Sequence, residues 1–458
     1  MTRKVIIFLM IVIVLISSGC SYRRISPPDN NQGKQGNIPK EDKLAKSKKE
    51  AVEENINGFT LEDDLKITDL TEMEEENRVS ALGQAERNRL LGKIGSKSMN
   101  TVLEEYTTTL PTTINSTLQY REYEMAYDYF LITAEEGGKV HESPTPNSEI
   151  VAEVANLDKV SLLQRVDGVE ANGSNIWYRV AFKNGDGLKE GYLSSATGTP
   201  RSFRFDSMEA AVNKLKQLLA QGPLNFISNY KNQNGTPPQI GEESIDQYGY
   251  RFYHSAAAYS EASTESEFRY IPDGMLVRII NETEEFYHVN VPDFEGDFYV
   301  QKQYINRENT LTDLRKVVVV DRDQQNQASF EVVEGGLNLV SYVLSTTGFK
   351  GEFSFVTTLG NFKVIEKRER FEYLQNGTQE IAGYAPYALR FTGGAYIHGV
   401  PVAYKEENGE KVDPGIIEYL HTIGTFPRSN MCVRNFSSHA EFLYNWMDSQ
   451  NGAVIIID

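Results

Sequence analysis

The chain has 458 residues, which at roughly 150 residues per domain corresponds to about three domains. Its 40% apolar and 11% aromatic content is enough to form packed cores, and its net charge of −18 argues against nucleic acid as a partner. Two cysteines, Cys20 and Cys432, are too few for a disulfide framework or a zinc site, so stability must come from packing.

The chain begins with a short apolar segment. Two basic residues precede the unbroken apolar run Val5–Ile16, which is followed by Ser17–Cys20. A membrane span needs about 20 apolar residues, so this pattern predicts a cleaved signal peptide over residues 1–20. The segment resembles a bacterial lipoprotein signal, which implies that Cys20 is lipidated and holds the protein outside the cytoplasm on a bacterial membrane. The alternative is an ordinary signal with an incidental cysteine.

Residues 21–125 are predicted to form a largely disordered tether. They are polar, contain the pair Pro27-Pro28 and the acidic cluster Glu62–Asp64, and show no sustained apolar period. One short helix is indicated around Val79–Leu91. About a hundred flexible residues have a span on the order of 50 Å, which would hold the following domains away from a membrane.

Two later segments, residues 126–201 and 246–308, consist of short β-type runs separated by turns such as Asn172-Gly173. The runs are Val160–Val166, Trp177–Phe182 and Gly191–Leu193 in the first segment, and Leu276–Ile280, Phe286–Val289 and Phe298–Val300 in the second. Both segments resemble bacterial SH3-type domains, small β-barrels that bind cell-wall peptide or act as spacers. We expect residues 126–308 to fold and to bind wall material without the last domain.

The aromatic residues of these segments have two interpretations, barrel core or ligand contact, and the first is favoured. They are Trp177, Tyr178, Tyr192, Tyr287 and Tyr299. Between the segments, residues 202–245 are predicted to be a helical connector. Asp206–Glu209 has the spacing of a capping box, and the apolar residues that follow at helical intervals predict an amphipathic helix packed against a barrel.

From residue 312 to residue 458 the composition favours β-structure. The predicted strands are Lys316–Val320, Phe330–Val333, Leu339–Leu344, Phe353–Phe355, Asn361–Ile365 and Val454–Ile457. One helix is predicted over Ser438–Met447, with a serine cap. The fold class is therefore mostly β and multidomain: two small SH3-like barrels followed by a β-rich domain with a helix near its C-terminus.

Four motifs of this last domain lie in one order along the chain. They are Ser345–Gly348, Thr357–Phe362, Tyr396–Gly399 and Ser429–Arg434. Together they resemble the motifs of the L,D-transpeptidase catalytic domain of bacterial cell-wall enzymes. Taken alone, His398 and Cys432 would more readily be a packed histidine and a buried thiol; the ordered set favours a catalytic pair.

The resemblance implies roles for the residues of the last two motifs. Cys432 would be the nucleophile and His398 its base, with the main-chain carbonyl of Gly399 fixing the imidazole tautomer. Main-chain N–H groups of Met431 and Cys432 would receive the oxyanion. Arg434 would anchor the loop or face a substrate carboxylate, and the anchoring role is favoured.

Two features depart from the family pattern. Asn430-Met431 stand where the family has His-Gly, and a methionine with φ > 0 is strained where a glycine is not. Ser429 keeps the family residue, so Ser429 and Asn430 are expected to anchor the loop or to contact substrate. A polar insertion, Lys405–Asp413, is a candidate lid or substrate-specific loop.

The implied reaction is acyl transfer between peptidoglycan stem peptides. Cys432 would attack the amide after an L-centred diamino acid, release D-alanine and leave a thioester, which an amine of a second stem resolves into a cross-link. Water as the acceptor would make the protein an L,D-carboxypeptidase. No metal or organic cofactor is required, and a carbapenem would acylate Cys432. The competing class is a non-catalytic or degenerate peptidoglycan-binding lipoprotein, which Asn430-Met431 favours.

Overall fold

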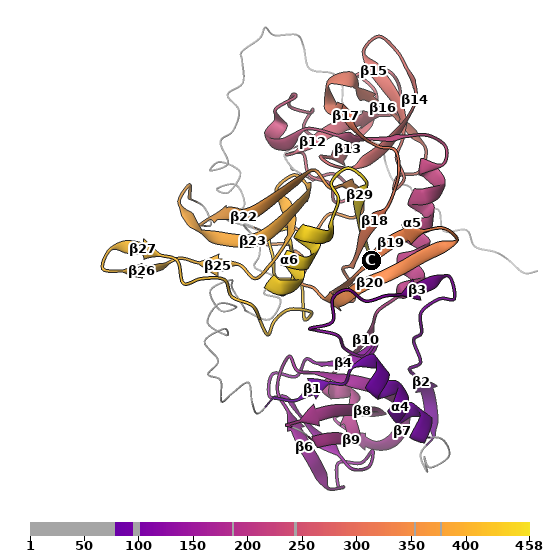
Figure 1. The fold of residues 1–458 in the computed structure, drawn as a ribbon, viewed down its shortest axis with the longest axis vertical. Helices are drawn as coiled ribbons and strands as arrows, with labels where there is room; N and C mark the ends of the chain where they lie inside the picture. The colour runs from indigo at the N-terminus through magenta and orange to yellow at the C-terminus, as the bar shows by residue number, and fades with distance from the viewer. Residues whose placement is uncertain (1–77, 95–100, 186, 242–244, 352–353, 376–377) are drawn as a thin grey trace, which may run out of the picture.

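The computed structural model describes residues 78–94, 101–185, 187–241, 245–351, 354–375 and 378–458. The predicted signal peptide, the lipidation site Cys20 and residues 21–77 of the predicted tether lie outside the described residues. Figure 1 shows two β-rich domains at opposite ends of the molecule, with the C-terminal domain between them.

The first β domain is an antiparallel sheet of strand order β10-β4-β7-β8-β9-β5-β6, with β1 added to β8 and β2 to β7. Its elements are β1 (Ser80–Ala81), α4 (Gln84–Ile94), β2 (Val102–Glu105), β4 (Asp128–Ile132), β5 (Gly138–His141), β6 (Ile150–Val154), β7 (Lys159–Ala171), β8 (Ser174–Asn184), β9 (Gly187–Ser194), η2 (Ser195–Thr197) and β10 (Gly198–Ser202). The predicted turn Asn172-Gly173 joins β7 to β8, and both of its residues have positive φ, as a tight hairpin turn requires.

The ordered structure begins earlier than predicted, which corrects the tether over residues 78–94 and 101–125. Leu82 and Leu90 pack against Leu163 of β7, and Arg87 makes a buried ion pair with Asp128 at 3.1 Å. Further on, β3 (Ile114–Ser116) pairs in parallel with a strand of the C-terminal domain. This segment is polar overall and is held by a few apolar side chains and one buried ion pair. Its composition is therefore that of a tether, and composition alone could not predict that it packs against the folded domains.

The connector helix α5 spans Phe205–Leu219 and buries Phe205, Met208, Val212, Leu215 and Leu218. It begins before the predicted capping box, and Arg204 at its N-cap makes no side-chain cap hydrogen bond. The apolar face packs against β18 (Lys316–Asp321) and β29 (Gly452–Ile457) of the C-terminal domain, and it shares an apolar cluster with Leu224, Phe226 and Leu276 of the β domain that follows. None of the described helices is long and apolar enough to cross a membrane.

The second β domain has the strand order β13-β12-β16-β15-β14-β11-β17. Its elements are β11 (Leu224–Ile227), η3 (Tyr230–Asn232), β12 (Ser255–Tyr259), β13 (Phe268–Pro272), β14 (Leu276–Glu282), β15 (Phe286–Asn290), β16 (Asp297–Gln301), η4 (Lys302–Tyr304) and β17 (Ile305–Leu311). The core interpretation is confirmed for the buried Trp177, Tyr178, Tyr192 and Tyr287. The SH3-like assignment of the two domains stays a prediction.

The C-terminal domain contains two main sheets, ordered β21-β29-β18-β19-β20-β3 and β22-β23-β24-β28, with β25 added to β23. Its elements are β18 (Lys316–Asp321), β19 (Asn326–Val333), β20 (Gly336–Leu344), β21 (Gly360–Lys363), β22 (Glu366–Leu374), β23 (Ile381–Thr392), β24 (Ala395–His398), β25 (Val402–Ala403), β26 (Lys405–Glu407), β27 (Glu410–Val412), β28 (Val433–Arg434), α6 (Ser437–Trp446) and β29 (Gly452–Ile457). Helix α6 packs against β23 and β24. The mostly β, multidomain class with a late helix is confirmed, although Ser354 and Phe355 form no strand and α6 has no serine cap.

The three domains share their cores. One apolar cluster joins Val277 and Tyr287 of the second β domain to Phe362 and Val454 of the C-terminal domain. A second cluster joins α5 and the end of the first β domain to the same C-terminal sheet. This sharing speaks against the prediction that residues 126–308 fold alone, because removing the last domain would expose both clusters to water.

Candidate active site

Strand pairing places His398 and Cys432 on neighbouring segments of one sheet. His398 ends β24, which pairs in parallel with β28 in the register Ile397↔Val433 and His398↔Arg434. Cys432 directly precedes β28 and therefore lies two residues from the partner of His398. Because side chains alternate along a strand, positions 432 and 434 share a face with position 398. The two predicted catalytic residues thus stand on the same face of neighbouring strands.

His398 is buried and held through its backbone neighbour, as predicted. Its Nδ1 lies 2.6 Å from the carbonyl oxygen of Gly399, so Nδ1 carries the proton and Nε2 keeps its lone pair. Burial lowers the pKa of His398 to about 4, the nearby charge of Arg434 adds to the effect, and the bond to Gly399 opposes it. At neutral pH the imidazole is therefore an uncharged hydrogen-bond acceptor.

The Cys432 thiol is also buried, and its Sγ lies 3.9 Å from the carbonyl oxygen of Gly394. Burial raises the pKa of Cys432 to about 11, against smaller opposing effects of the Tyr396 backbone and of Arg434. The resting pair is consequently a neutral thiol and a neutral imidazole, not a thiolate–imidazolium ion pair. Proton transfer to His398 must therefore accompany the attack of sulfur on a substrate.

Met431 has the strained backbone that the sequence indicated, with φ at +64°. A non-glycine residue in this region costs roughly 1–3 kcal/mol, which the surrounding structure must supply. The Met431 N–H donates to the carbonyl oxygen of Phe355 at 2.8 Å. The Met431 N–H can therefore donate to an oxyanion only after its hydrogen bond to Phe355 has broken. The role of this N–H as an oxyanion donor stays a prediction.

The loop before the nucleophile is held by short polar side chains. The hydroxyl of Ser429 donates to the carbonyl oxygen of Cys432. Thr357 Oγ1 accepts the Gly348 N–H at 2.7 Å and donates to the Met431 carbonyl oxygen at 2.9 Å. A Cβ on Gly348 would lie 2.6 Å from the Met431 nitrogen, so only glycine fits there. Gly348 of the first motif and Thr357 of the second thus hold the loop of the fourth motif in place.

The two remaining residues of the fourth motif also hold the loop. Asn430 Oδ1 accepts the N–H of Phe355 at 3.1 Å. Arg434 is buried and exchanges two backbone hydrogen bonds with Thr346, at 2.8 and 3.0 Å. These contacts place both residues where the loop-anchoring prediction requires them.

We expect replacement of Thr357 by valine to weaken the hydrogen bonding that holds the loop before Cys432. The variant leaves the buried N–H of Gly348 and the carbonyl of Met431 without their partner, a loss of about 1–3 kcal/mol for each unsatisfied group. Chemical denaturation should show a lower unfolding midpoint, and thiol labelling should show faster access of a neutral alkylating reagent to Cys432. Thr378→Val at an exposed position of the same domain is the control. Equal labelling rates in the two variants would contradict the assigned role of Thr357.

Other predicted features have defined positions. The insertion Lys405–Asp413 forms the exposed hairpin β26–β27, and Asp413 at its end contacts Arg370 and the hydroxyl of Tyr384. His439 is buried in the core between Asn435 and Ser341.

A residue of the second β domain also contacts the nucleophile loop, which sequence analysis did not indicate. Arg251 Nη1 lies 2.8 Å from Sδ of Met431, and the guanidinium stands 3.5 Å from the ring centre of Phe355. It thus touches both residues joined by the Met431–Phe355 hydrogen bond. A contact across 180 residues leaves no periodic or motif signal in a single sequence.

With the geometry established, sequence comparison agrees with the motifs. Residues 315–457 match the family model of the L,D-transpeptidase catalytic domain (YkuD). The C-terminal domain is thus assigned to this family, and the predicted resemblance over residues 312–458 is confirmed. At the level of the family, this match supports an L,D-transpeptidase catalytic domain over residues 315–457. A comparison with curated proteins finds no match.

Solved structures show distant likenesses. An L,D-transpeptidase from Mycobacterium smegmatis is 14% identical, with 65% of this chain and 99% of that chain covered and a TM-score of 0.24. LD transpeptidase LdtMt1, solved in complex with imipenem, is 12% identical, with coverages of 44% and 78% and a TM-score of 0.24. A fused Zn-dependent amidase/peptidase/peptidoglycan-binding protein from Clostridium acetobutylicum is 15% identical, with coverages of 31% and 52% and a TM-score of 0.22. At such low scores the assignment rests on the family model alone.

Proposed function

We propose that the protein is a cell-wall L,D-transpeptidase that cross-links peptidoglycan stems by cysteine acyl transfer. The observation that carries the proposal is the arrangement of Cys432 and His398 on one face of paired strands, with the His398 tautomer fixed by Gly399. That arrangement lies inside a domain matched to the L,D-transpeptidase family. An uncharged base beside a thiol in a buried site is suited to acyl transfer.

In the first step, Sγ of Cys432 attacks the carbonyl carbon of the amide after the diamino acid of a donor stem. The thiol proton moves to Nε2 of His398, and the developing oxyanion is met by main-chain N–H groups of the nucleophile loop. The C–N bond then breaks, the imidazolium proton passes to the leaving amine, and D-alanine departs. A thioester remains on Cys432.

In the second step, an amine of an acceptor stem attacks the thioester carbon. His398 takes a proton from this amine, the C–S bond breaks, and the proton returns to sulfur to regenerate the thiol. The product is an amide cross-link. No cofactor is needed, because the bond energy of the donor amide is retained in the thioester.

Exposure of the purified protein to a carbapenem, followed by intact-mass analysis, tests the first step. We expect one adduct of the mass of the β-lactam, located on Cys432 by peptide mapping and absent from Cys432→Ala. Incubation with a tetrapeptide stem should release D-alanine in the wild type only. Failure of both assays in protein that melts normally would rule out the enzyme.

Burial of His398 also predicts an unusual pH dependence. Protonation abolishes the base, so kcat/KM for acylation must fall as pH falls through the pKa of the folded imidazole. Because that pKa is lowered from 6.5 to about 4, we expect activity to persist to pH values well below 6. A pH series of acylation rates measures the midpoint. A midpoint near 6.5 would show that the imidazole is solvated in the acting enzyme.

A second candidate is a non-catalytic or degenerate peptidoglycan-binding lipoprotein. It is favoured by the bond from the Met431 N–H to Phe355, which occupies a proposed oxyanion donor. The third candidate, an L,D-carboxypeptidase, shares the thioester and differs only in using water as acceptor. A tetrapeptide assay with and without an acceptor amine separates the three: no D-alanine, D-alanine with a tripeptide product, or a cross-linked product.

We further propose that the protein is anchored on the outer side of a bacterial membrane through lipidated Cys20, with the two β domains as wall-binding or spacer modules. The motif Ser17–Cys20 after the apolar run supports the anchor. Cys20→Ala should release the protein from the membrane fraction or leave the precursor uncleaved. Retention of a correctly cleaved Cys20→Ala protein on the membrane would refute this proposal.

A further inference from the structure

The turn between β18 and β19 is held by the first β domain. The hydroxyl of Tyr129 in β4 donates to the carbonyl oxygen of Gln324 at 2.8 Å, and the N–H of Ser202 in β10 donates to Oε1 of Gln324 at 2.9 Å. Asn326 Nδ2 donates to the carbonyl oxygen of Ser202 at 2.9 Å. Both strands lie at the end of the first β domain that faces the C-terminal domain (Figure 1). The first β domain therefore fixes the residues on either side of Gln325.

The start of the same turn is held by an ion pair. Arg204, which follows β10, donates through Nε and Nη2 to the two carboxylate oxygens of Asp321, at 2.7 and 2.6 Å. Asp321 is fully buried, and its Oδ1 also accepts the Gln324 N–H at 3.0 Å. A bidentate, charge-assisted pair restricts orientation as well as position. The turn is thus fixed at its beginning and at its end.

Gln325 connects this turn to the nucleophile loop, Ser429–Cys432. Its buried side chain accepts the Thr347 N–H through Oε1 at 2.9 Å and donates through Nε2 to the Thr347 hydroxyl at 2.7 Å. The carbonyl oxygen of Thr347 accepts the Ser429 N–H at 3.1 Å, and the Ser429 hydroxyl donates to the carbonyl oxygen of Cys432. One residue, Thr347, therefore separates Gln325 from the loop that carries the thiol.

A second connection starts at Arg322 in the same turn. Its Nη1 donates to the carbonyl oxygen of Thr357 at 2.6 Å, and the Thr357 hydroxyl donates to the carbonyl oxygen of Met431 at 2.9 Å. The guanidinium is fixed by Asp458, whose carboxylate accepts Nε and Nη2 at 2.7 and 2.6 Å. The turn thus holds the nucleophile loop at two points, Ser429 and Met431.

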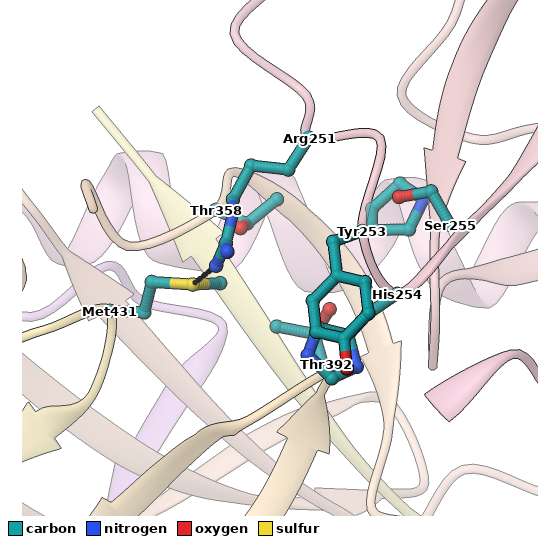
Figure 2. A pocket seen from close by; sticks show the side chains of 9 residues that line it. Arg251, Tyr253, His254, Ser255, Thr358, Thr392 and Met431 are labelled. Atoms are coloured by element: carbon teal, nitrogen blue, oxygen red, sulfur yellow. Dashed lines mark hydrogen bonds between the residues drawn. The ribbon is translucent and has the colours of Figure 1, made fainter. Parts of the chain in front are cut away.

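The nucleophile loop depends on such contacts because its own backbone is strained. Met431 has a φ of +64°, and Gln325 in the turn has a φ of +51°. Residues other than glycine adopt this region only when the surrounding structure maintains it. Figure 2 shows the Met431 side chain in contact with Arg251 of the second β domain, while the turn holds the loop through main-chain carbonyl and N–H groups. The position of Cys432 is therefore set by distant residues rather than by local backbone preference.

We propose that Gln325 is a positioning residue for Cys432, and that the first β domain is required for the full reactivity of the thiol because it fixes the β18–β19 turn. Gln325 acts through Thr347 and Ser429 and not on the reacting atoms. The inference rests on the proposed transpeptidase function for the acyl-transfer step. The first β domain is then part of the apparatus that arranges the active site, in addition to any role as a spacer.

Two substitutions in the full chain test the connection. Tyr129→Phe removes the shorter of two hydrogen bonds to the Gln324 carbonyl, the other being from Arg201 at 3.4 Å, and keeps the aromatic ring. We expect it to lower the rate of carbapenem acylation at saturation about threefold, and Gln325→Met, which loses both bonds to Thr347, to lower it about tenfold. The carbapenem concentration at half saturation should stay unchanged, because the thiol is displaced and ground-state binding is not altered.

Tyr342→Phe is the matched control. Tyr342 is also buried, and its hydroxyl donates to a main-chain carbonyl, that of Met125, at 2.9 Å. The two tyrosine variants should therefore show similar decreases in melting temperature. Only Tyr129→Phe should slow acylation and speed alkylation of Cys432 by iodoacetamide, since a loosened loop admits a small neutral reagent. A loss of stability alone would change both variants equally.

The two assays distinguish failure of the inference from failure of the proposed function. If the wild type is acylated, rates in Tyr129→Phe equal to those in Tyr342→Phe in either assay would overturn the inference and leave the transpeptidase intact. If the wild type forms no adduct and releases no D-alanine, the proposed function fails and alkylation decides alone. Faster alkylation in Tyr129→Phe than in Tyr342→Phe would then retain the positioning of Cys432 by the turn, and equal rates would refute it.

Discussion

Replacement of His398 by alanine is expected to slow carbapenem acylation of Cys432 by about 10²–10⁴-fold, the usual contribution of a positioned general base. The reason lies in the burial of both groups. With the pKa of Cys432 raised to about 11, almost no thiolate exists at neutral pH without a proton acceptor. Removing Nε2 of His398 leaves the thiol protonated. Intact-mass kinetics on wild type, His398→Ala and Cys432→Ala measure the effect, and Cys432→Ala should show no adduct.

His439→Ala is the matched control for this prediction. His439 is fully buried in the same domain and bonds Asn435 and Ser341, so its loss should lower the melting temperature and leave the acylation rate nearly unchanged. If His398→Ala behaves in the same way as His439→Ala, then His398 is a core residue and the catalytic assignment is wrong.

The candidate catalytic residues could be proposed from the sequence because a motif records local geometry. His398 with Gly399 and Ser429 to Arg434 each fold within a few residues, and the hydrogen bond from Nδ1 to the next carbonyl needs only that neighbour. Strands rich in β-branched residues, such as β18 and β29, could be predicted for the same reason. The left-handed backbone at Met431 also followed from local comparison, since the family places a glycine there.

The domain contacts could not be predicted, because they depend on residues distant in sequence. Arg251 is separated from Met431 by 180 positions, and the anchoring of residues 78–94 and 101–125 depends on few apolar side chains in a polar segment. The sequence alone also could not predict that His398 and Cys432 are both uncharged at neutral pH. A pKa near 4 for His398 follows from its burial, which the packing of residues distant in sequence creates and no motif encodes.

Arg390 is a buried cation that links the second β domain to the strand beside the active site. Its Nη1 donates to Asp273 at 2.8 Å, and Asp273 also accepts the N–H groups of Asn229 at 2.8 Å and of Gly393 at 3.2 Å. The Asp273 side chain is 2% exposed and the Arg390 side chain is 10% exposed. Water therefore cannot substitute for a missing carboxylate at this position.

We expect Asp273→Ala to lower the free energy of unfolding by about 3–5 kcal/mol, the usual result of leaving one member of a buried ion pair uncompensated. Because Gly393 bonds Asp273 and precedes Gly394, whose carbonyl oxygen lies 3.9 Å from Sγ of Cys432, the variant should also alter alkylation of Cys432. Urea denaturation measures the stability, and separate unfolding of the second β domain would appear as an additional transition.

Asp313→Ala removes a carboxylate of the exposed pair with Arg315, whose side chains are 54% and 68% exposed, and should cause no measurable change. Asp273→Asn distinguishes charge from packing, since it keeps an acceptor for the Asn229 N–H but leaves Arg390 only its longer ion pair with the partly exposed Glu366, at 3.3 Å. Its stability should lie close to that of Asp273→Ala if the uncompensated charge dominates. A stability loss in Asp273→Ala no larger than that in Asp313→Ala would show that the second β domain is held by its apolar contacts, and that Arg390 finds water or another partner when the carboxylate is removed.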